Sequence, residues 1–298
     1  MSLRDVFKQK RVFSLEIFPP KRNGDLSKIY ATIEALAQLR PDFISVTYGA
    51  GGSGSCGASI EIAKAIRERH HIRSIAHLPA IGLKAVDVDA ILLKLKDAGI
   101  TNILALRGDR PQNPDFKPGD FRYASELITY IKSRGDFEIS AACYPETHIE
   151  ARSAVEDIRN LKLKVNAGAQ HLISQLFFDN ELFYAFREKC AIAGIEVPIE
   201  AGIMPVVNAK QIQRMVTLCK VSLPKKFLRI MSRYENKPEA LRDAGIAYSI
   251  DQIVDLITNG ADGIHLYTMN NASTALRIYE AVHNLISIDD LPREQSMV

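Results

Sequence analysis

The residues of this chain that could do chemistry stand at the ends of apolar segments. Residues 104–109 (LALRGD) are the clearest case, because three apolar residues lead into an Arg, a Gly and an Asp. The apolar run predicts a strand buried on both faces, which Gly108 and Pro111 end. Folds of the α/β class place their ligands where such strands end. The pattern therefore predicts that Arg107 and Asp109 face a ligand, and a salt bridge that only fixes the loop is the alternative.

Polar side chains follow other predicted strands in the same way. These positions are Glu16, Thr47, His77, Tyr144, Gln175 and Tyr267. In a closed barrel of parallel strands they would all converge on one mouth. Taken singly, each has a structural explanation, such as a rim histidine, a strand cap or an amide that fixes backbone. Together, a carboxylate, an imidazole, an amide and two phenols predict an active site.

Glu16 is the sharpest of these candidates, because it interrupts an apolar strand between Leu15 and Ile17. Burial disfavours the charged form of a carboxyl group and raises its pKa. The position therefore predicts a general acid that is protonated at neutral pH. The alternative is a buried Glu paired with an Arg or a Lys.

A helix expected at residues 149–166 carries a second polar group. Asp157, Asn160 and Lys164 are spaced i, i+3 and i+7, so they share one helix face. An acid, an amide and a cation together suit the sugar hydroxyls and phosphates of a nucleotide-like ligand. A solvated helix face is the alternative.

Strand and helix patterns alternate eight times along the chain. Strands are expected at residues 12–18, 43–48, 74–78, 103–107, 138–143, 171–176, 198–203 and 263–267. Helices are expected at residues 25–39, 59–68, 87–98, 123–133, 149–166, 180–193, 209–219, 238–258 and 273–286. Such alternation demands parallel strands with helical crossovers. We therefore predict one (β/α)8 barrel over residues 1–298, with a short N-terminal extension, a helical insert before the last strand and a frayed C-terminal tail.

Composition excludes several classes of protein. The chain of 298 residues has 47% hydrophobic and 24% charged residues, as soluble enzymes do. Its net charge of +3 and its longest basic run, residues 8–11 (KQKR), argue against nucleic-acid binding. Four cysteines without zinc-type spacing predict reduced thiols and no metal site. The absence of a secretory signal or a long apolar run predicts a cytoplasmic protein without membrane spans.

One glycine motif is misleading. Residues 49–54 (GAGGSG) match G-x-G-x-x-G after a strand, as in a dinucleotide-binding Rossmann fold. That fingerprint also needs an acidic residue at the end of the next strand. The next strand ends in His77, Leu78 and Pro79, so a Rossmann fold is rejected.

The segments taken together resemble the methylenetetrahydrofolate reductase family, in its short bacterial type without the regulatory domain. The matching segments are residues 14–21 (SLEIFPPK), 45–50 (SVTYGA), 105–109 (ALRGD), 144–148 (YPETH), 175–179 (QLFFD), 202–205 (GIMP) and 265–270 (HLYTMN). The resemblance covers nearly the whole chain, and the series of motifs in this order is specific.

The resemblance implies a flavin enzyme. NADH or NADPH would reduce non-covalently bound FAD, and 5,10-methylenetetrahydrofolate would then be reduced to 5-methyltetrahydrofolate on the same face. Glu16 would be the acid that opens the one-carbon bridge to an iminium, and Asp109 would lie near flavin and pterin. The family also commonly forms homo-oligomers, and an electron-carrier protein is a possible alternative donor.

The resemblance also assigns binding residues. The positions matching flavin contacts are Thr47, His77, Arg107, Gly108, Asp109, Tyr123, Ala124, Tyr144, His148, Asp157, Asn160 and Lys164. Gln175 would bind the pterin, and Gln211 and Tyr267 would contact folate or nicotinamide. Two positions depart from the pattern: Met215 replaces a Phe that stacks on substrate, and Asn271 replaces an Arg that could meet a carboxylate or phosphate. The loss of that cation keeps open the alternative of a non-catalytic or electron-accepting FAD-binding subunit.

Overall fold

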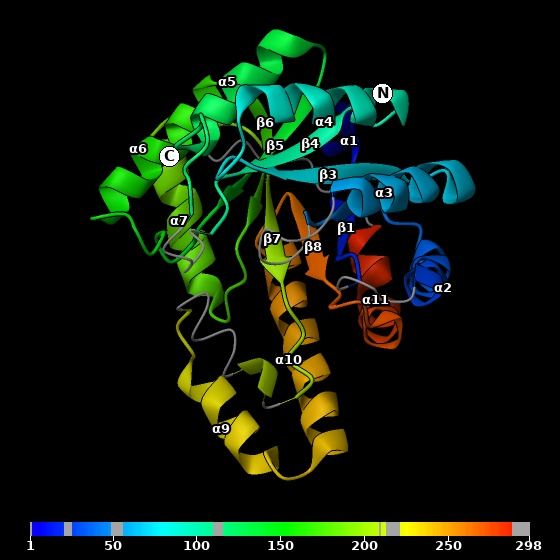
Figure 1. Ribbon diagram of the computed structural model, residues 1–298. Helices are drawn as coiled ribbons and strands as arrows, with labels where there is room; N and C mark the ends of the chain where they lie inside the picture. Colours follow the sequence, from blue (N-terminus) through cyan, green and yellow to red (C-terminus); the bar gives the residue numbers. More distant parts are fainter. Residues whose placement is uncertain are drawn as a thin grey trace.

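A computed structural model of the protein describes residues 2–20, 26–48, 56–109, 116–208, 210–212 and 221–287. Its centre is a closed barrel in which eight parallel strands follow one another in chain order (Figure 1). The strands are β1 (Val12–Ile17), β2 (Phe43–Val46), β3 (Arg73–Pro79), β4 (Asn102–Leu106), β5 (Glu138–Cys143), β6 (Ala169–Ser174), β7 (Ile199–Ile203) and β8 (Gly263–Tyr267). The predicted (β/α)8 barrel is confirmed, and the closed sheet excludes the Rossmann fold.

Helices alternate with the strands and cover the outside of the barrel (Figure 1). They are α1 (Leu3–Gln9), α2 (Leu26–Ala37), α3 (Cys56–His70), α4 (Ala85–Asp97), α5 (Ala124–Arg134), α6 (Ala154–Asn166), α7 (Asn180–Ile192), α9 (Lys225–Tyr234), α10 (Pro238–Thr258) and α11 (Ala272–Ile286).

The main hydrophobic core lies between the strands and these helices. On α2, for example, the apolar residues Ile29, Ile33 and Leu36 recur every three to four residues and are all buried. Each such side chain contributes about 1.5–3 kcal/mol when it is fully removed from water. The helical periodicity of the sequence is therefore what fixes each helix to the sheet.

The N-terminal extension closes one end of the barrel, which the sequence analysis did not anticipate. Leu3, Val6 and Phe7 of α1 join a separate core cluster with interior strand residues such as Phe43. The backbone N–H of Leu3 also donates to the carboxylate of Glu138 at 2.9 Å, at the N-terminal end of β5. With this end plugged, ligands reach the interior from the opposite end, where the strands terminate.

The insert before β8 forms α9 and part of α10, which project from the barrel (Figure 1). Phe227 and Met231 of α9 pack with Leu176 and Phe178, which follow β6, and with Met204, which follows β7. Helix α9 was not expected from the sequence. Of the helix expected at residues 209–219, residues 209 and 213–219 lie outside the described residues. The insert therefore has its own small core, anchored beside the barrel mouth.

The expected helix at 149–166 was wrong at its start, because α6 begins at Ala154. The hydroxyl of Ser153 accepts a hydrogen bond from the backbone N–H of Glu156, which fixes the first turn there. Residues before Ser153 therefore form a loop that reaches over the barrel mouth.

In the described part of the chain, every helix is too short or too polar to cross a bilayer.

Candidate active site at the barrel mouth

Glu16 lies at the centre of the polar cluster inside the mouth. One carboxylate oxygen, Oε2, lies 3.6 Å from Nε2 of His77 on β3 and 3.7 Å from Nε2 of His265 on β8. The hydroxyl of Thr268 donates to the backbone carbonyl of Glu16 at 2.7 Å, which holds β1 against the end of β8. The Glu16 side chain keeps 19% of its surface exposed. One carboxyl group therefore faces two imidazoles while it still reaches the open mouth.

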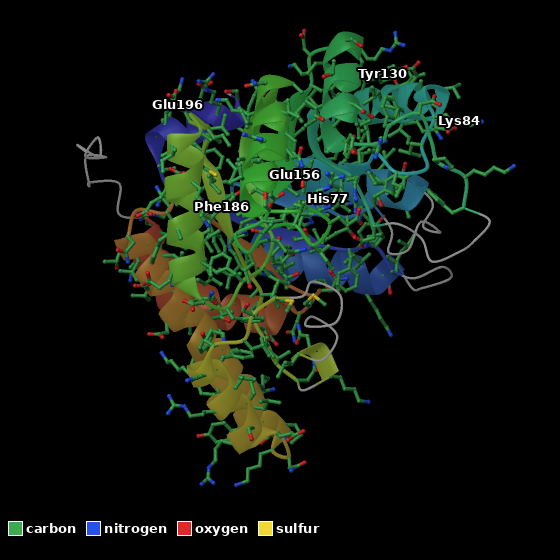
Figure 2. The ribbon with its side chains drawn as sticks, turned by 90° about the vertical axis from the view of Figure 1, so that its left-hand side faces the viewer. His77, Lys84, Tyr130, Glu156, Phe186 and Glu196 are labelled. Atoms are coloured by element: carbon green, nitrogen blue, oxygen red, sulfur yellow. The ribbon has the colours of Figure 1, made fainter. Side chains whose placement is uncertain are left out.

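His77 lies near the middle of the molecule, whereas Tyr130 and Lys84 lie at its periphery (Figure 2). Burial lowers the pKa of His77 to about 4, against the opposing attraction of Glu16. Its Nε2 atom is buried and has no hydrogen-bond partner among the residues that the structure describes. His77 is therefore a neutral imidazole at physiological pH with one unsatisfied nitrogen beside Glu16.

The end of β4 carries the charged pair predicted from the sequence. Arg107 makes a two-pronged pair with Glu150, at 2.5 and 2.7 Å, and this pairing raises the pKa of Arg107. Gly108 has φ +85°, and a Cβ there would lie 2.6 Å from Cγ2 of Ile81. Only glycine fits this backbone without strain. Asp109, the next residue, is exposed at the mouth.

Next to it, the end of β5 and helix α6 form a second polar group. The backbone N–H of His148 donates to Asp157 at 2.8 Å, and Lys164 donates to the carbonyl of Ala142 at 2.8 Å. The ring of Tyr144 meets that of His148 edge-on, with centroids 4.6 Å apart. Burial lowers the pKa of Lys164 and raises that of Tyr144. The structure thus brings together four residues that the sequence placed on separate motifs.

The remaining predicted flavin positions lie around these two groups. Thr47 follows β2 and accepts a hydrogen bond from the Ser59 hydroxyl at its carbonyl, at 2.8 Å. Tyr123 is half exposed at the start of α5, and Ala124 beside it is buried. Asn160 lies on α6 and is exposed, whereas Asp157 and Lys164 of the same helix are half-buried and bond to the backbone of His148 and Ala142.

This donor set fits a dinucleotide such as FAD. Arg107 and Lys164 supply two cations for a diphosphate, and the carboxylate and amide of α6 suit sugar hydroxyls. The glycine at position 108 lets the backbone come close to a ligand. The unsatisfied nitrogen of His77 is a further polar atom within the mouth. For a diphosphate to take the Arg107 guanidinium, however, Glu150 must release it.

The predicted substrate residues lie on the other side of the mouth. The hydroxyl of Tyr267 donates to the carbonyl of Ser174 at 2.7 Å. The amide oxygen of Gln175 accepts from the backbone N–H of Leu176 at 3.0 Å. Both side chains therefore sit at the strand ends in fixed orientations, as binding residues require.

A cleft of about 350 Å³ adjoins this side of the mouth and is lined by Gln211, Lys210, Thr268 and Asn271. The Gln211 amide accepts from the N–H of Val207 at 3.1 Å and donates to a neighbouring carbonyl, so it ties the loop together. Asn271 caps α11, because its side-chain oxygen accepts from the N–H of Thr274 at 3.1 Å. Met215 and residues 49–54 lie outside the described residues.

Sequence reasoning missed His265, Ser14 and Glu150. The strand period of two was the available signal for the first two, since residues i and i+2 share a face. Ser14 precedes Glu16 by two residues, and His265 precedes Tyr267 by two. Glu150 carried no comparable signal, because a charged loop residue is ordinary.

It also missed a buried acid on β7. Glu200 is completely buried, and its Oε1 atom accepts a hydrogen bond from the Ser14 hydroxyl at 2.7 Å. Its other oxygen lies 2.8 Å from Nε2 of His171 on β6. The signal was the same one that identified Glu16, a carboxyl group within an apolar strand.

Known proteins are similar to this chain along nearly its whole length. The model of the family "Methylenetetrahydrofolate reductase" matches residues 2–283. The 5,10-methylenetetrahydrofolate reductase of Pectobacterium carotovorum subsp. carotovorum is 38% identical over 283 residues, covering 94% of this chain and 92% of that protein. A probable methylenetetrahydrofolate reductase (NADH) of Oryza sativa subsp. japonica is 34% identical over 283 residues. The match covers 90% of this chain and 48% of the rice protein.

Among solved structures, an uncharacterized protein from Clostridium thermocellum that binds two copies of 5-methyl-5,6,7,8-tetrahydrofolic acid has a TM-score of 0.61. Its identity is 14%, and the match covers 94% of this chain and 96% of that one, so it shows the fold alone. The family model and the bacterial relative both span nearly the whole chain. The chain belongs to the methylenetetrahydrofolate reductase family.

Proposed function

We propose that the protein reduces 5,10-methylenetetrahydrofolate to 5-methyltetrahydrofolate, with electrons that pass from a nicotinamide dinucleotide through bound FAD. Membership of the family supports the reaction, and the rice relative named for NADH supports a nicotinamide donor. The observation that carries the proposal is Glu16, a carboxyl group at the barrel mouth that faces two imidazoles.

FAD binding is assigned to the β4–β6 side of the mouth. Arg107 and Lys164 would hold the diphosphate, and Asp157 and Asn160 would bind sugar hydroxyls. Thr47, His77, Gly108, Tyr123, Ala124, Tyr144 and His148 complete this set. When bound, FAD supplies a carrier that takes a hydride from the nicotinamide and passes it to the one-carbon unit.

Glu16 acts as the general acid. It donates its proton to the folate nitrogen whose bond to the bridging methylene carbon breaks, which leaves an iminium that can accept a hydride. Because burial lowers the pKa of His77 to about 4, His77 is neutral at pH 7 and places no positive charge beside the carboxyl group of Glu16. Asp109 at the rim would polarise the pterin, and Gln175, Gln211, Met215 and Tyr267 would bind folate or nicotinamide.

We also propose where the enzyme acts in the cell and that it forms an oligomer. We place it in the cytoplasm, where reduced thiols such as the buried Cys143 and Cys190 persist, and we expect a homo-oligomer. Analytical ultracentrifugation of the flavin-bound protein tests the second point.

The experiment is anaerobic. The purified protein is analysed for flavin, its flavin is reduced chemically, and 5,10-methylenetetrahydrofolate is added. We expect rapid reoxidation of the flavin with formation of 5-methyltetrahydrofolate, after which NADH, NADPH and reduced carrier proteins are compared as donors. Bound FAD that stays reduced contradicts the reaction, and failure to bind FAD at all contradicts the cofactor.

A further inference from the structure

A second acid lies below Glu16 in the interior of the barrel. Glu200 of β7, Ser14 of β1 and His265 of β8 have no solvent-exposed surface. Gly263 on the neighbouring strand makes room for this acid, because a Cβ there would lie 2.7 Å from Cγ of Glu200. No Arg or Lys among the described residues pairs with this carboxyl group, and it has no access to water, which is unusual in a protein core.

Two short contacts lead from this buried acid towards Glu16, and a gap of 3.7 Å separates the last group from it. The hydroxyl oxygen of Ser14 lies 2.7 Å from Oε1 of Glu200 and 2.6 Å from Nδ1 of His265. The opposite ring nitrogen of His265, Nε2, faces Oε2 of Glu16 at 3.7 Å. A shift of the Glu16 carboxylate by about 0.8 Å would turn this last contact into a hydrogen bond. The two carboxyl groups are thus ends of one chain of proton-carrying groups.

Strand register explains why these groups meet. Ser14 pairs with His265 across β1 and β8, and Glu16 pairs with Tyr267 two residues further on. Since residues i and i+2 of a strand share a face, Ser14 lies below Glu16 on the same side of β1. The chain therefore runs from the closed half of the barrel up to the mouth.

We propose that Glu200 is an internal proton reserve that reprotonates Glu16 through Ser14 and His265 after each turnover. The inference rests on the proposed function, because Glu16 loses a proton only if it protonates a substrate. Glu200 does not contact the substrate. It acts on the reaction only through Glu16, whose proton it restores.

The transfer balances atom by atom. Glu200 gives its proton to the Ser14 oxygen, while Ser14 gives its own proton to Nδ1 of His265. His265 releases the proton on Nε2 to the Glu16 carboxylate. One O–H bond is lost at Glu200 and one is formed at Glu16, and the histidine changes tautomer without a net change in charge. Between turnovers the same transfers run in reverse and return the proton to Glu200, and the Glu16 carboxylate then takes a proton from water at the open mouth.

The surroundings of Glu200 favour its protonated form. Burial raises the pKa of Glu200 to about 8, with smaller opposing contributions from His265 and Ser14. The remaining groups that face it are His171, whose pKa burial lowers to about 3, and the more distant carboxylates Asp42 and Asp262. His171 is therefore neutral, and the two carboxylates disfavour a further negative charge.

The kinetic test compares the wild-type holoenzyme with Glu200→Gln and Ser14→Ala. Ser140→Ala is the matched control, since its hydroxyl lies 2.9 Å from Nδ1 of His171, on the far side of Glu200 from the relay. The rate of flavin reoxidation by methylenetetrahydrofolate is measured against pH, and flavin reduction by NADH is the internal reference.

We expect Glu200→Gln and Ser14→Ala to move the alkaline limb of the reoxidation rate down by about one pH unit, which is about tenfold in rate on that limb. Ser140→Ala should follow the wild-type profile, and flavin reduction should be unchanged in all variants. Equal shifts in all three variants would indicate a structural effect. A shift in Glu200→Gln alone would indicate a through-space charge effect. Either result, or wild-type profiles throughout, overturns the proposal.

A second readout does not depend on the folate reaction. Nitrogen NMR of the histidine rings in the wild-type protein should show His265 protonated on Nε2 near neutral pH and switching to Nδ1 as Glu200 ionises. Glu200→Gln should abolish that switch. If methylenetetrahydrofolate fails to reoxidise wild-type flavin but the switch is present, the proposed function fails and the relay stands. A tautomer that is the same at every pH in both proteins overturns the relay.

Discussion

At the scale of single residues, two acids lie in the barrel interior at different depths. Glu16 keeps a path to the open mouth, whereas Glu200 has no exposed surface. An acid that must reach a substrate needs the first position, and an acid that only stores a proton tolerates the second. This difference in depth assigns different roles to two residues of the same type.

Glu16→Gln removes the proton donor but keeps the size of the side chain. We expect flavin reoxidation by methylenetetrahydrofolate to slow by about 10²- to 10⁴-fold, the range for a lost general acid. Flavin content and flavin reduction by NADH should be unchanged, because neither needs this proton. Stopped-flow measurement of the two half-reactions checks the prediction, and an equal loss in both would contradict it.

Glu150→Gln tests whether Arg107 is withheld from the cofactor. The Arg107–Glu150 pair is partly exposed, so its contribution is small, about 0.2–1 kcal/mol. Releasing the guanidinium should therefore tighten FAD binding by about two- to fivefold. Titration of flavin-free protein by flavin fluorescence measures this. Glu146→Gln, which changes another carboxylate of the same loop, should leave the affinity for FAD unchanged. Weaker FAD binding in Glu150→Gln would contradict the idea that Glu150 withholds Arg107 from the cofactor.

At the scale of elements, the positions of the site residues depend mainly on where the strands end and where the helices begin. The loop between β5 and α6 brings Glu150 to Arg107 only because α6 starts at Ala154. Similarly, α11 begins beside the cleft, where Asn271 is its N-cap. The departure from the family pattern at this position therefore has a structural role of its own.

Asn271→Ala should destabilise the protein by about 1 kcal/mol, because the N–H of Thr274 loses its capping oxygen. Asn271→Ser keeps a capping hydroxyl and should retain most of the stability. Urea unfolding of the two variants beside wild type measures the difference. Equal free energies of unfolding for the two variants would show that the cap contributes nothing.

At the scale of the whole molecule, the barrel interior makes stability depend on pH. His77 and His171 have pKa values of about 4 and about 3 in the folded protein, against 6.5 when unfolded. Between these values the unfolded chain binds more protons, so stability rises as the pH rises towards 6.5. Glu200 acts in the opposite sense, since its pKa is about 8 when folded and 4.5 when unfolded. Of these three groups, only Glu200 changes its contribution to stability as the pH rises above 6.5.

The thermal midpoint should therefore be highest near pH 6.5 and should fall on both sides. Glu200→Gln removes the titrating group, so its midpoint should not decline between pH 6.5 and 8 as that of the wild type does. Differential scanning calorimetry across this range decides the matter. A wild-type curve that keeps rising to pH 8 would contradict the assigned pKa of Glu200.

The sequence by itself determined the barrel and the identity of most candidate residues. Eight alternations of period-2 and period-3.6 patterns leave little freedom, since the crossovers are right-handed and eight such units in a chain of this length favour a closed barrel. Glu16, Arg107 and Tyr267 were found because polar residues at the ends of apolar strands stand out. These features are local, so they can be recognised from residues that are adjacent in the sequence.

Tertiary structure alone decided which of these groups meet. In the relay from Glu200 to Glu16, the contact between Ser14 and Glu200 joins residues 186 positions apart, through a register that no local pattern encodes. The Arg107–Glu150 pair and the plug formed by α1 likewise depend on where loops and termini fold back. Contacts between distant segments follow from the packing of the closed barrel as a whole, which is why the sequence identified Glu16 but neither Glu200 nor the path between them.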